Sequence, residues 1–356
     1  MLHSSSLIPP DFELAIPGNV GFFEFLIVVS FLAHILFVNI TIGTSAMAVF
    51  QEIRGIRSKK PEDDKLAFQL ATHTSVLKSI AVVLGVAPLL LISVIYTQYF
   101  YPSTILIGKA WLSLIILIIT AFLILYVYKF MWDNMSRDPV KKRWHVAIGA
   151  MGSLLLLFVP LIFIVNVVSM LYPEMWEGAK GFFHGLFYYP QIWPRYFHFI
   201  LASFAISGFY LYFWNNRLQK TVENADETAQ NMMKKGKRFG LKVMIGTTVL
   251  QFAFGFILLF SFDRDIRMLY MGDDLLLTTL LVVSLLTTAL LVYLLYLLMV
   301  KEKRTYFLLS LSTFVLILGI MGWMRHELRE SYLDPYMNDM PRTTQLEEID
   351  EQVLED

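Results

Sequence analysis

Two histidines of this 356-residue chain lie in long apolar segments. His34 follows the apolar run 25–33 and precedes Ile35 to Val38, while His198 opens the apolar run 199–214. An ionisable side chain is costly next to lipid, so it normally faces the interior of a helical bundle. There an imidazole can bind a haem iron or another metal, relay protons, or hydrogen-bond a neighbour. His34 and His198 are therefore the first candidates for chemistry.

The elements that must position these histidines are membrane-spanning helices. The chain is 56% hydrophobic and 16% charged, which is typical of a polytopic membrane protein. Apolar stretches of about 20 residues match a bilayer core that is ~30 Å thick. We therefore predict an all-α polytopic fold of about eight transmembrane helices, as one haem-binding helical domain over 1–328 and an acidic extramembrane tail over 329–356. The predicted helices are 20–50, 70–100, 105–132, 144–171, 194–216, 238–262, 274–300 and 304–328.

Composition excludes several function classes. The net charge is zero, so no general attraction to nucleic acid is implied. The chain contains no cysteine, which excludes disulfides, iron–sulfur clusters and haem attached through CxxCH. The segment 1–19 lacks a basic region followed by an apolar core, so it does not resemble a signal peptide, and the first helix is expected to target the chain.

The basic residues are segregated along the chain. Four connections carry 20 of the 29 lysines and arginines, and by the positive-inside rule these connections are cytoplasmic. Both termini are then expected on the opposite side, the periplasm if the chain spans a bacterial inner membrane. The four basic connections are 51–69, 129–143, 217–242 and 301–304.

This topology brings three candidate iron ligands into the outer half of the membrane, namely His34, His198 and Glu327. They come from three different predicted helices, and imidazole nitrogen or carboxylate oxygen can bind a haem iron. Trp323 precedes Glu327 by one helical turn. Haem propionates need cations near the interface, and arginine suits carboxylate pairing. The arginines placed for this role are Arg195, Arg325 and Arg329.

Other polar and aromatic residues carry weaker signals. His73 and His145 lie near the basic ends of two helices, where solvent or headgroup contact competes with metal ligation. The aromatic segments 99–102 and 172–194 are expected at the headgroup level. The acidic segment 346–356 is interpreted as a solvated tail or, alternatively, as a docking helix for a partner.

Three short motifs surround the candidate ligands in chain order. They are His34-Ile-Leu-Phe-Val-Asn-Ile-Thr-Ile-Gly43, Arg195-Tyr-Phe-His198 with Ala202, Ser203 and Gly208 behind it, and Gly322-Trp323-Met-Arg-His-Glu327. These motifs resemble the haem-binding subunit I of cytochrome bd quinol oxidases. The family pattern has a first-helix histidine followed by Phe-Leu-Phe-Val-Pro-Leu-Thr-Leu-Gly, a fifth-helix low-spin haem histidine, and Gly-Trp-x-x-x-Glu, whose glutamate binds a high-spin haem.

The chain also departs from that pattern. The family's long quinol-binding loop is reduced here to about 263–273, and the segment 111–128 lacks the carboxylates that the family uses for proton delivery. Leu328-Arg329-Glu330-Ser331 stands where the family has Arg-Gln-Pro-Trp. The family's methionine, sixth ligand of its low-spin haem, has no match in the seventh helix. Met244 in the sixth helix resembles its local context and is a weaker candidate.

The resemblance implies a membrane-embedded electron-transfer subunit of a respiratory complex with two or three non-covalent b haems. Its expected partners are other subunits of that complex and a periplasmic cytochrome c, with quinone as a further candidate. The alternatives are a bd-like terminal oxidase subunit, a quinol dehydrogenase subunit, and a haem-free anchor or scaffold subunit. A small-molecule transporter is disfavoured because no inverted repeat or pair of broken helices is evident.

Overall fold

Eight long helices dominate the computed structural model, which describes residues 8–9, 19–135, 138–222 and 226–337. Each is long and apolar enough to cross a membrane, which confirms the predicted all-α multi-pass fold. Between them lie the short helices α3 (Thr97–Leu106), α5 (Trp132–Met135), η1 (Pro173–Met175), α7 (Phe182–Tyr188), α10 (Arg264–Met268) and η2 (Leu269–Asp273). The long helices are α1 (Val20–Ser58), α2 (Pro61–Ile95), α4 (Gly108–Phe130), α6 (Pro139–Leu171), α8 (Ile192–Thr221), α9 (Glu227–Phe260), α11 (Leu275–Lys301) and α12 (Arg304–Met337).

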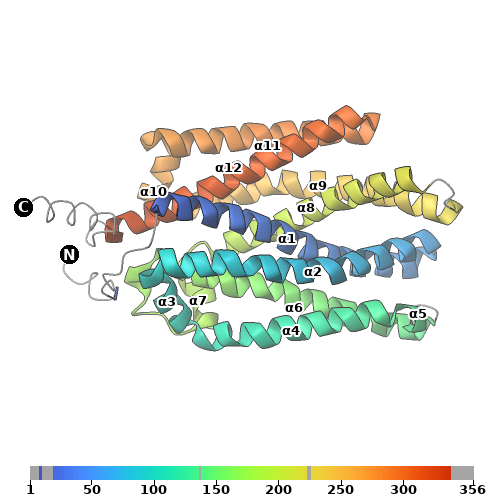
Figure 1. Ribbon diagram of the computed structural model, residues 1–356, viewed down its shortest axis with the longest axis horizontal. Coiled ribbons are helices and arrows are strands. Elements are labelled where there is room, and N and C mark those ends of the chain that lie inside the picture. The colour runs from blue at the N-terminus through green and yellow to red at the C-terminus, as the bar shows by residue number, and fades with distance from the viewer. Residues whose placement is uncertain (1–7, 10–18, 136–137, 223–225, 338–356) are drawn as a thin grey trace, which may run out of the picture.

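The long helices run side by side and alternate in direction (Figure 1). The start of α1 and the end of α12 lie at the same end of the bundle, which we call the terminal end. The four basic connections lie at the opposite end, which we call the basic end. An even number of spans produces this arrangement. As a consequence α1 and α8 run parallel, both from the terminal end toward the basic end.

Several helices extend further than hydropathy alone predicts. α1 continues to Ser58, where Lys59 ends it in a left-handed conformation with φ 55°, and α2 already begins at Pro61. Proline suits a first helical turn because its missing N–H has no partner there anyway. The predicted connections 51–69 and 217–242 are thus mostly helical. Charged residues such as lysine and glutamate are good helix formers, so helices continue past their apolar parts.

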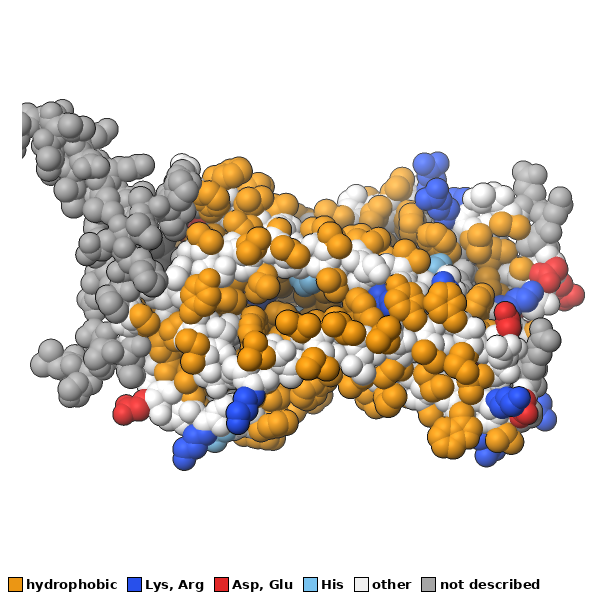
Figure 2. Space-filling model, turned by 60° about the horizontal axis from the view of Figure 1, so that its bottom comes forward, with side chains coloured by type: hydrophobic (Ala, Val, Ile, Leu, Met, Phe, Trp, Pro, Cys, Tyr) orange, Lys and Arg blue, Asp and Glu red, His pale blue; other side chains and the backbone are white. Residues whose placement is uncertain are grey.

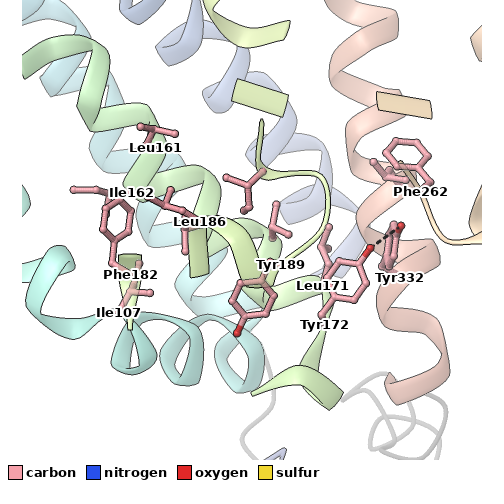
Figure 3. Close-up of a cluster of buried hydrophobic side chains, with 14 of the residues drawn as sticks. Ile107, Leu161, Ile162, Leu171, Tyr172, Phe182, Leu186, Tyr189, Phe262 and Tyr332 are labelled. Carbon is pink, nitrogen blue, oxygen red and sulfur yellow. Dashed lines mark hydrogen bonds between the residues drawn. The ribbon is translucent and has the colours of Figure 1, made fainter. Parts of the chain in front are cut away.

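Several residues of the aromatic segment near the terminal end pack in the core. Tyr172, Trp176 and Tyr189 are buried, and the Trp176 indole donates to the Ser169 carbonyl at 2.8 Å. Figure 3 shows the cluster that Tyr172 and Tyr189 join, where a hydrogen bond of 3.2 Å links Tyr172 to Tyr332 of α12. This cluster ties α6, α7 and α12 together. The expected loop at 99–102 is likewise helical and lies within α3.

The surface agrees with a bilayer environment. Figure 2 shows hydrophobic side chains over the middle of one face, with most charged side chains toward its two ends. Large exposed apolar residues occur on most spans, including Val83, Ile116, Leu154 and Leu286. In water such a surface would be a liability, whereas lipid tails are as apolar as these side chains.

Candidate functional site

His34 lies on α1 against the backbone of α2. Its Nδ1 is 2.9 Å from the Ala81 carbonyl oxygen, and its ring fits against Gly85. A Cβ at Gly85 would lie 2.8 Å from His34 Cε1, so the glycine leaves the space that the imidazole fills. Because a carbonyl can only accept, Nδ1 carries the proton and Nε2 keeps its lone pair. A ligand histidine commonly has this arrangement, with one nitrogen oriented by a carbonyl.

His198 lies on α8 and faces Gly255 of α9, where a Cβ would be 3.9 Å from its Cε1. Its Nδ1 is buried and has no hydrogen-bond partner among the described residues. Leaving such a polar atom unsatisfied costs about 1–3 kcal/mol. Buried polar groups without partners in a native protein usually indicate a missing water, ion or ligand. His198 therefore has the surroundings expected of a ligand to a group that occupies space between helices.

The packing of α1 against α8 places these two histidines at the same depth. Ser203 Oγ donates to Asn39 Oδ1 at 2.7 Å, and Ser207 Oγ donates to the Asn39 carbonyl at 3.1 Å. His34 precedes Asn39 by five residues and His198 precedes Ser203 by five, on parallel helices. Both imidazoles therefore lie ~7.5 Å nearer the terminal end than the Asn39–Ser203 pair.

Glu327 and Trp323 reach the same half of the bundle from α12. Gly322 packs against the Leu32 side chain of α1, so α12 crosses α1 within one turn of His34. The Trp323 side chain lies beside the Glu327 carboxylate, one turn earlier on α12. Glu327 lies five residues beyond Gly322, hence ~7.5 Å closer to the terminal end than this crossing. The structure thus brings the helices of all three predicted ligands together, with Glu327 nearest the terminal end.

Three arginines form a positively charged cluster beside these residues. Arg195 and Arg329 both lie within electrostatic range of Arg325. Arg325 stacks over the Phe31 ring at 3.8 Å, and Arg329 over the Tyr96 ring at 4.1 Å. Neither Arg195 nor Arg325 forms an ion pair with an acid among the described residues. Partly buried cations without counter-ions are costly, so this cluster is suited to binding an anionic group such as a carboxylate.

Gln191, which sequence reasoning missed, positions Arg195. Its Oε1 accepts from Arg195 Nε at 3.0 Å and from Arg195 Nη2 at 2.6 Å. Its Nε2 donates to Tyr172 Oη at 2.5 Å and to Tyr332 Oη at 2.7 Å. Gln191 has a left-handed backbone with φ 68°, a conformation that costs about 1–3 kcal/mol in a non-glycine residue. The only sequence signal is its place between Pro190 and Pro194.

A second group that sequence reasoning did not assemble lies between α1, α2 and α12. Ligand atoms of Glu24, His326 and Glu330 lie within 4.8 Å of one another, and Tyr96 Oη donates to Glu330. Arg329 Nη2 lies 2.9 Å from His326 Nδ1 and can only donate, so the His326 proton is on Nε2, toward Glu24. Metal binding through Nε2 would require that proton to leave. Burial raises the pKa of the Tyr96 hydroxyl, which stays a donor.

The weaker candidates take other roles. Both nitrogens of His145 are engaged, Nδ1 with Glu52 and Nε2 with the Tyr128 carbonyl, each at 2.7 Å. His145 is fully buried rather than solvent-exposed, and neither nitrogen is open to a metal. His73 Nδ1 is 3.2 Å from Tyr210 Oη, and its ring meets Trp214 edge-on at 4.5 Å.

Met244 does not lie beside His198. Its backbone contacts Gly208, where the small residues let α8 and α9 approach closely. On α9, the residue at the level of His198 is Gly255, eleven residues beyond Met244 and therefore ~16 Å away along the helix. One iron cannot bind both side chains across that distance. The resemblance in local sequence around Met244 is therefore not matched by its position.

No known protein family and no curated protein matches this chain by sequence. Among solved structures, the chain is similar to bd oxidase from Geobacillus thermodenitrificans. The two share 13% sequence identity over 88% of this chain and 87% of that chain, with a TM-score of 0.62. At this identity the likeness concerns the fold, which is therefore bd-oxidase-like.

Proposed function

We propose that this protein is a b-haem electron-transfer subunit of a respiratory membrane complex. The single observation that carries the proposal is the buried Nδ1 of His198, which has no hydrogen-bond partner among the described residues and lies at the depth of His34. The bd-oxidase-like fold supports the same interpretation. The prosthetic group would supply reversible one-electron chemistry, while the chain supplies ligation, spacing and electrostatic tuning.

The residues of the terminal half fit two or three non-covalent b haems. His198 and His34 would each offer a nitrogen lone pair, and Glu327 would offer a carboxylate oxygen. The cluster of Arg195, Arg325 and Arg329 would pair with propionates by charge-assisted hydrogen bonds. The Ala81 carbonyl would hold the His34 ring in the ligating tautomer, and Gln191 would hold the Arg195 guanidinium in place.

A periplasmic cytochrome c is the electron-exchange partner that we propose, together with other subunits of the complex. The connection between α9 and α11 consists of the short helices α10 and η2, which leaves little room for a quinol-binding loop. The acidic tail 346–356, which the proposal uses as a docking segment, lies outside the described residues. A quinone entering from the lipid is the competing partner.

A pyridine haemochrome assay on the purified full-length chain tests the proposal directly. We expect bound b haem and a low-spin signal in the reduced-minus-oxidised spectrum. A preparation that folds and inserts but holds no haem would favour the scaffold alternative and overturn the proposal. Oxygen consumption by the purified complex, together with a red-shifted chlorin band, would instead favour a terminal oxidase.

A further inference from the structure

A closed ring of polar groups lies at the basic end, far from the candidate haem ligands. His145 of α6, Glu52 of α1 and Tyr128 of α4 form it, and all three are buried within the bundle. His145 Nδ1 lies 2.7 Å from Glu52 Oε1, and Tyr128 Oη donates to Glu52 Oε2 at 2.8 Å. His145 Nε2 lies 2.7 Å from the Tyr128 carbonyl. Tyr128 of α4 therefore hydrogen-bonds both Glu52 and His145.

The hydrogen bonds determine how many protons this ring holds. The Tyr128 carbonyl can only accept, so His145 Nε2 carries a proton. One further proton must lie between His145 Nδ1 and Glu52 Oε1, because without it two lone pairs would face each other at 2.7 Å. Whether it sits on nitrogen or oxygen, the ring is neutral overall. Losing it would leave a negative charge on the Glu52 carboxylate, which has no solvent exposure, at high cost.

Aromatic rings enclose this proton. The Tyr128 ring stacks on the His145 ring at 4.5 Å, and Trp132 meets His145 edge-on at 4.9 Å. Exchange with water must therefore pass through polar atoms rather than through an open channel.

Asp64 of α2 is a partly exposed carboxylate close to the ring. Its side chain is 34% exposed, and its Oδ2 accepts from Lys142 at 2.6 Å. Its Oδ1 is buried, has no hydrogen-bond partner among the described residues, and lies against Gly55, one turn of α1 beyond Glu52. Asp64 also lies within electrostatic range of Tyr128. The neighbouring Asp63 is engaged elsewhere, with Lys235, Ser58 and Arg54.

We propose that the Glu52–His145–Tyr128 ring is a proton-binding site that exchanges its proton with the basic-end solution through the inward oxygen of Asp64. In the exchange step, the ring proton would leave Glu52 Oε1 through a bridging water for the Asp64 carboxylate, which leaves Glu52 ionised and Asp64 neutral. A proton returned from Asp64 by the same route would restore the neutral ring, so charge is conserved. The inference is independent of haem binding, because all its groups belong to this chain. It also supplies a carboxylate near α4, which contains none between residues 111 and 128.

The competing explanation is that the ring only clamps three helices together. The variant Glu52→Gln distinguishes the proton-binding site from the structural clamp. The glutamine NH2 group can donate to His145 Nδ1, and the glutamine carbonyl can accept from Tyr128 Oη. The variant keeps the ring's shape and hydrogen bonds but removes the shared proton. If the proposal holds, the melting temperature stays near that of the wild type while the proton signal disappears.

Infrared difference spectroscopy on the full-length chain in proteoliposomes provides that signal. We expect a carboxyl or imidazole band of the ring that shifts on transfer to deuterated water, and that is absent from Glu52→Gln. Asp64→Asn should slow the shift by about tenfold or more, as loss of a positioned acid–base group typically does. Lys142→Gln removes the same ion pair but keeps the carboxylate, so exchange should stay fast.

If Glu52→Gln fails to fold, Tyr128→Phe provides a second way to assign the infrared band to the ring. It removes one hydrogen bond from Glu52, so the band should move but persist. A wild-type chain with no exchangeable ring band would overturn the proposal. An exchange rate unchanged in Asp64→Asn, or slowed equally in Lys142→Gln, would overturn the role of Asp64 and leave a structural clamp.

Discussion

The hydrogen bond between Ser203 Oγ and Asn39 Oδ1 sets the register between α1 and α8. Because the two helices run parallel, this contact places His34 and His198 at one depth, five residues away on each helix. Ser207 reinforces the register by donating to the Asn39 and Ile40 carbonyls, each at 3.1 Å.

The contribution of this register contact can be measured by a double-mutant cycle. Ser203→Ala leaves Asn39 Oδ1 buried without its donor, which should destabilise the chain by about 1–3 kcal/mol. Combining it with Asn39→Ala should reveal a coupling energy of about 0.5–1.5 kcal/mol in detergent unfolding experiments. Additive effects of the two single variants would show that the bond does not set the register.

His198→Ala should abolish the low-spin b-haem spectrum while the chain still inserts. Insertion depends on hydropathy, which this substitution does not reduce, whereas the iron–imidazole bond is lost. The reduced-minus-oxidised spectrum of the purified variant measures the effect. His184→Ala, in the short helix α7, is the matched control and should retain the wild-type spectrum. A full haem complement in His198→Ala would contradict the assignment.

Gly85→Ala should weaken haem binding through His34 without changing a ligand. The added Cβ would lie 2.8 Å from His34 Cε1, so the ring must turn away from its position on the Ala81 carbonyl. Loss of such an orienting contact typically lowers metal affinity about 10–100-fold. Titration of the apo-protein with haem measures this affinity in the variant and in the wild type. Gly246→Ala, in open space on α9, should bind haem normally and gain about 0.5–1 kcal/mol of stability.

Glu327→Gln should alter the high-spin component of the spectrum and leave the low-spin component of His198 in place. The substitution keeps the side-chain volume but replaces an anionic oxygen by a neutral amide. Trp323→Phe removes the indole N–H beside Glu327 and should produce a smaller shift of the same component. Identical spectra for the wild type and Glu327→Gln would assign this glutamate to the surface instead.

Deleting residues 343–356 should slow electron exchange with a basic cytochrome c, or weaken association with a partner subunit. Opposite charges raise encounter rates, and added salt screens them, so high ionic strength should have the same effect on the full-length chain. Stopped-flow mixing with reduced cytochrome c measures the rate. Unchanged kinetics after deletion would leave these residues as a solvated end.

The sequence by itself determined the fold class, the number of spans and their order. Each membrane-spanning helix is determined by its own stretch of sequence, because about 20 consecutive apolar residues are enough to cross the bilayer core. The depth of His34, His198 and Glu327 within the terminal half was also predictable, because it follows from the distance of each residue to the nearest basic connection. The helix ends were less predictable, because polar residues beyond the apolar stretch can continue a helix.

The tertiary structure alone decided which side chains meet. His145 looked like a surface histidine from its place near a basic connection, yet packing of α1, α4 and α6 buries it against Glu52 and Tyr128. Met244 matched a motif in its local sequence, but on α9 it lies eleven residues nearer the basic end than Gly255, the residue at the level of His198. Glu24, His326 and Glu330 converge from helices at opposite ends of the chain. Such pairings depend on helix register and rotation, which small residues such as Gly43, Gly85 and Gly208 set through close packing and which hydropathy does not encode.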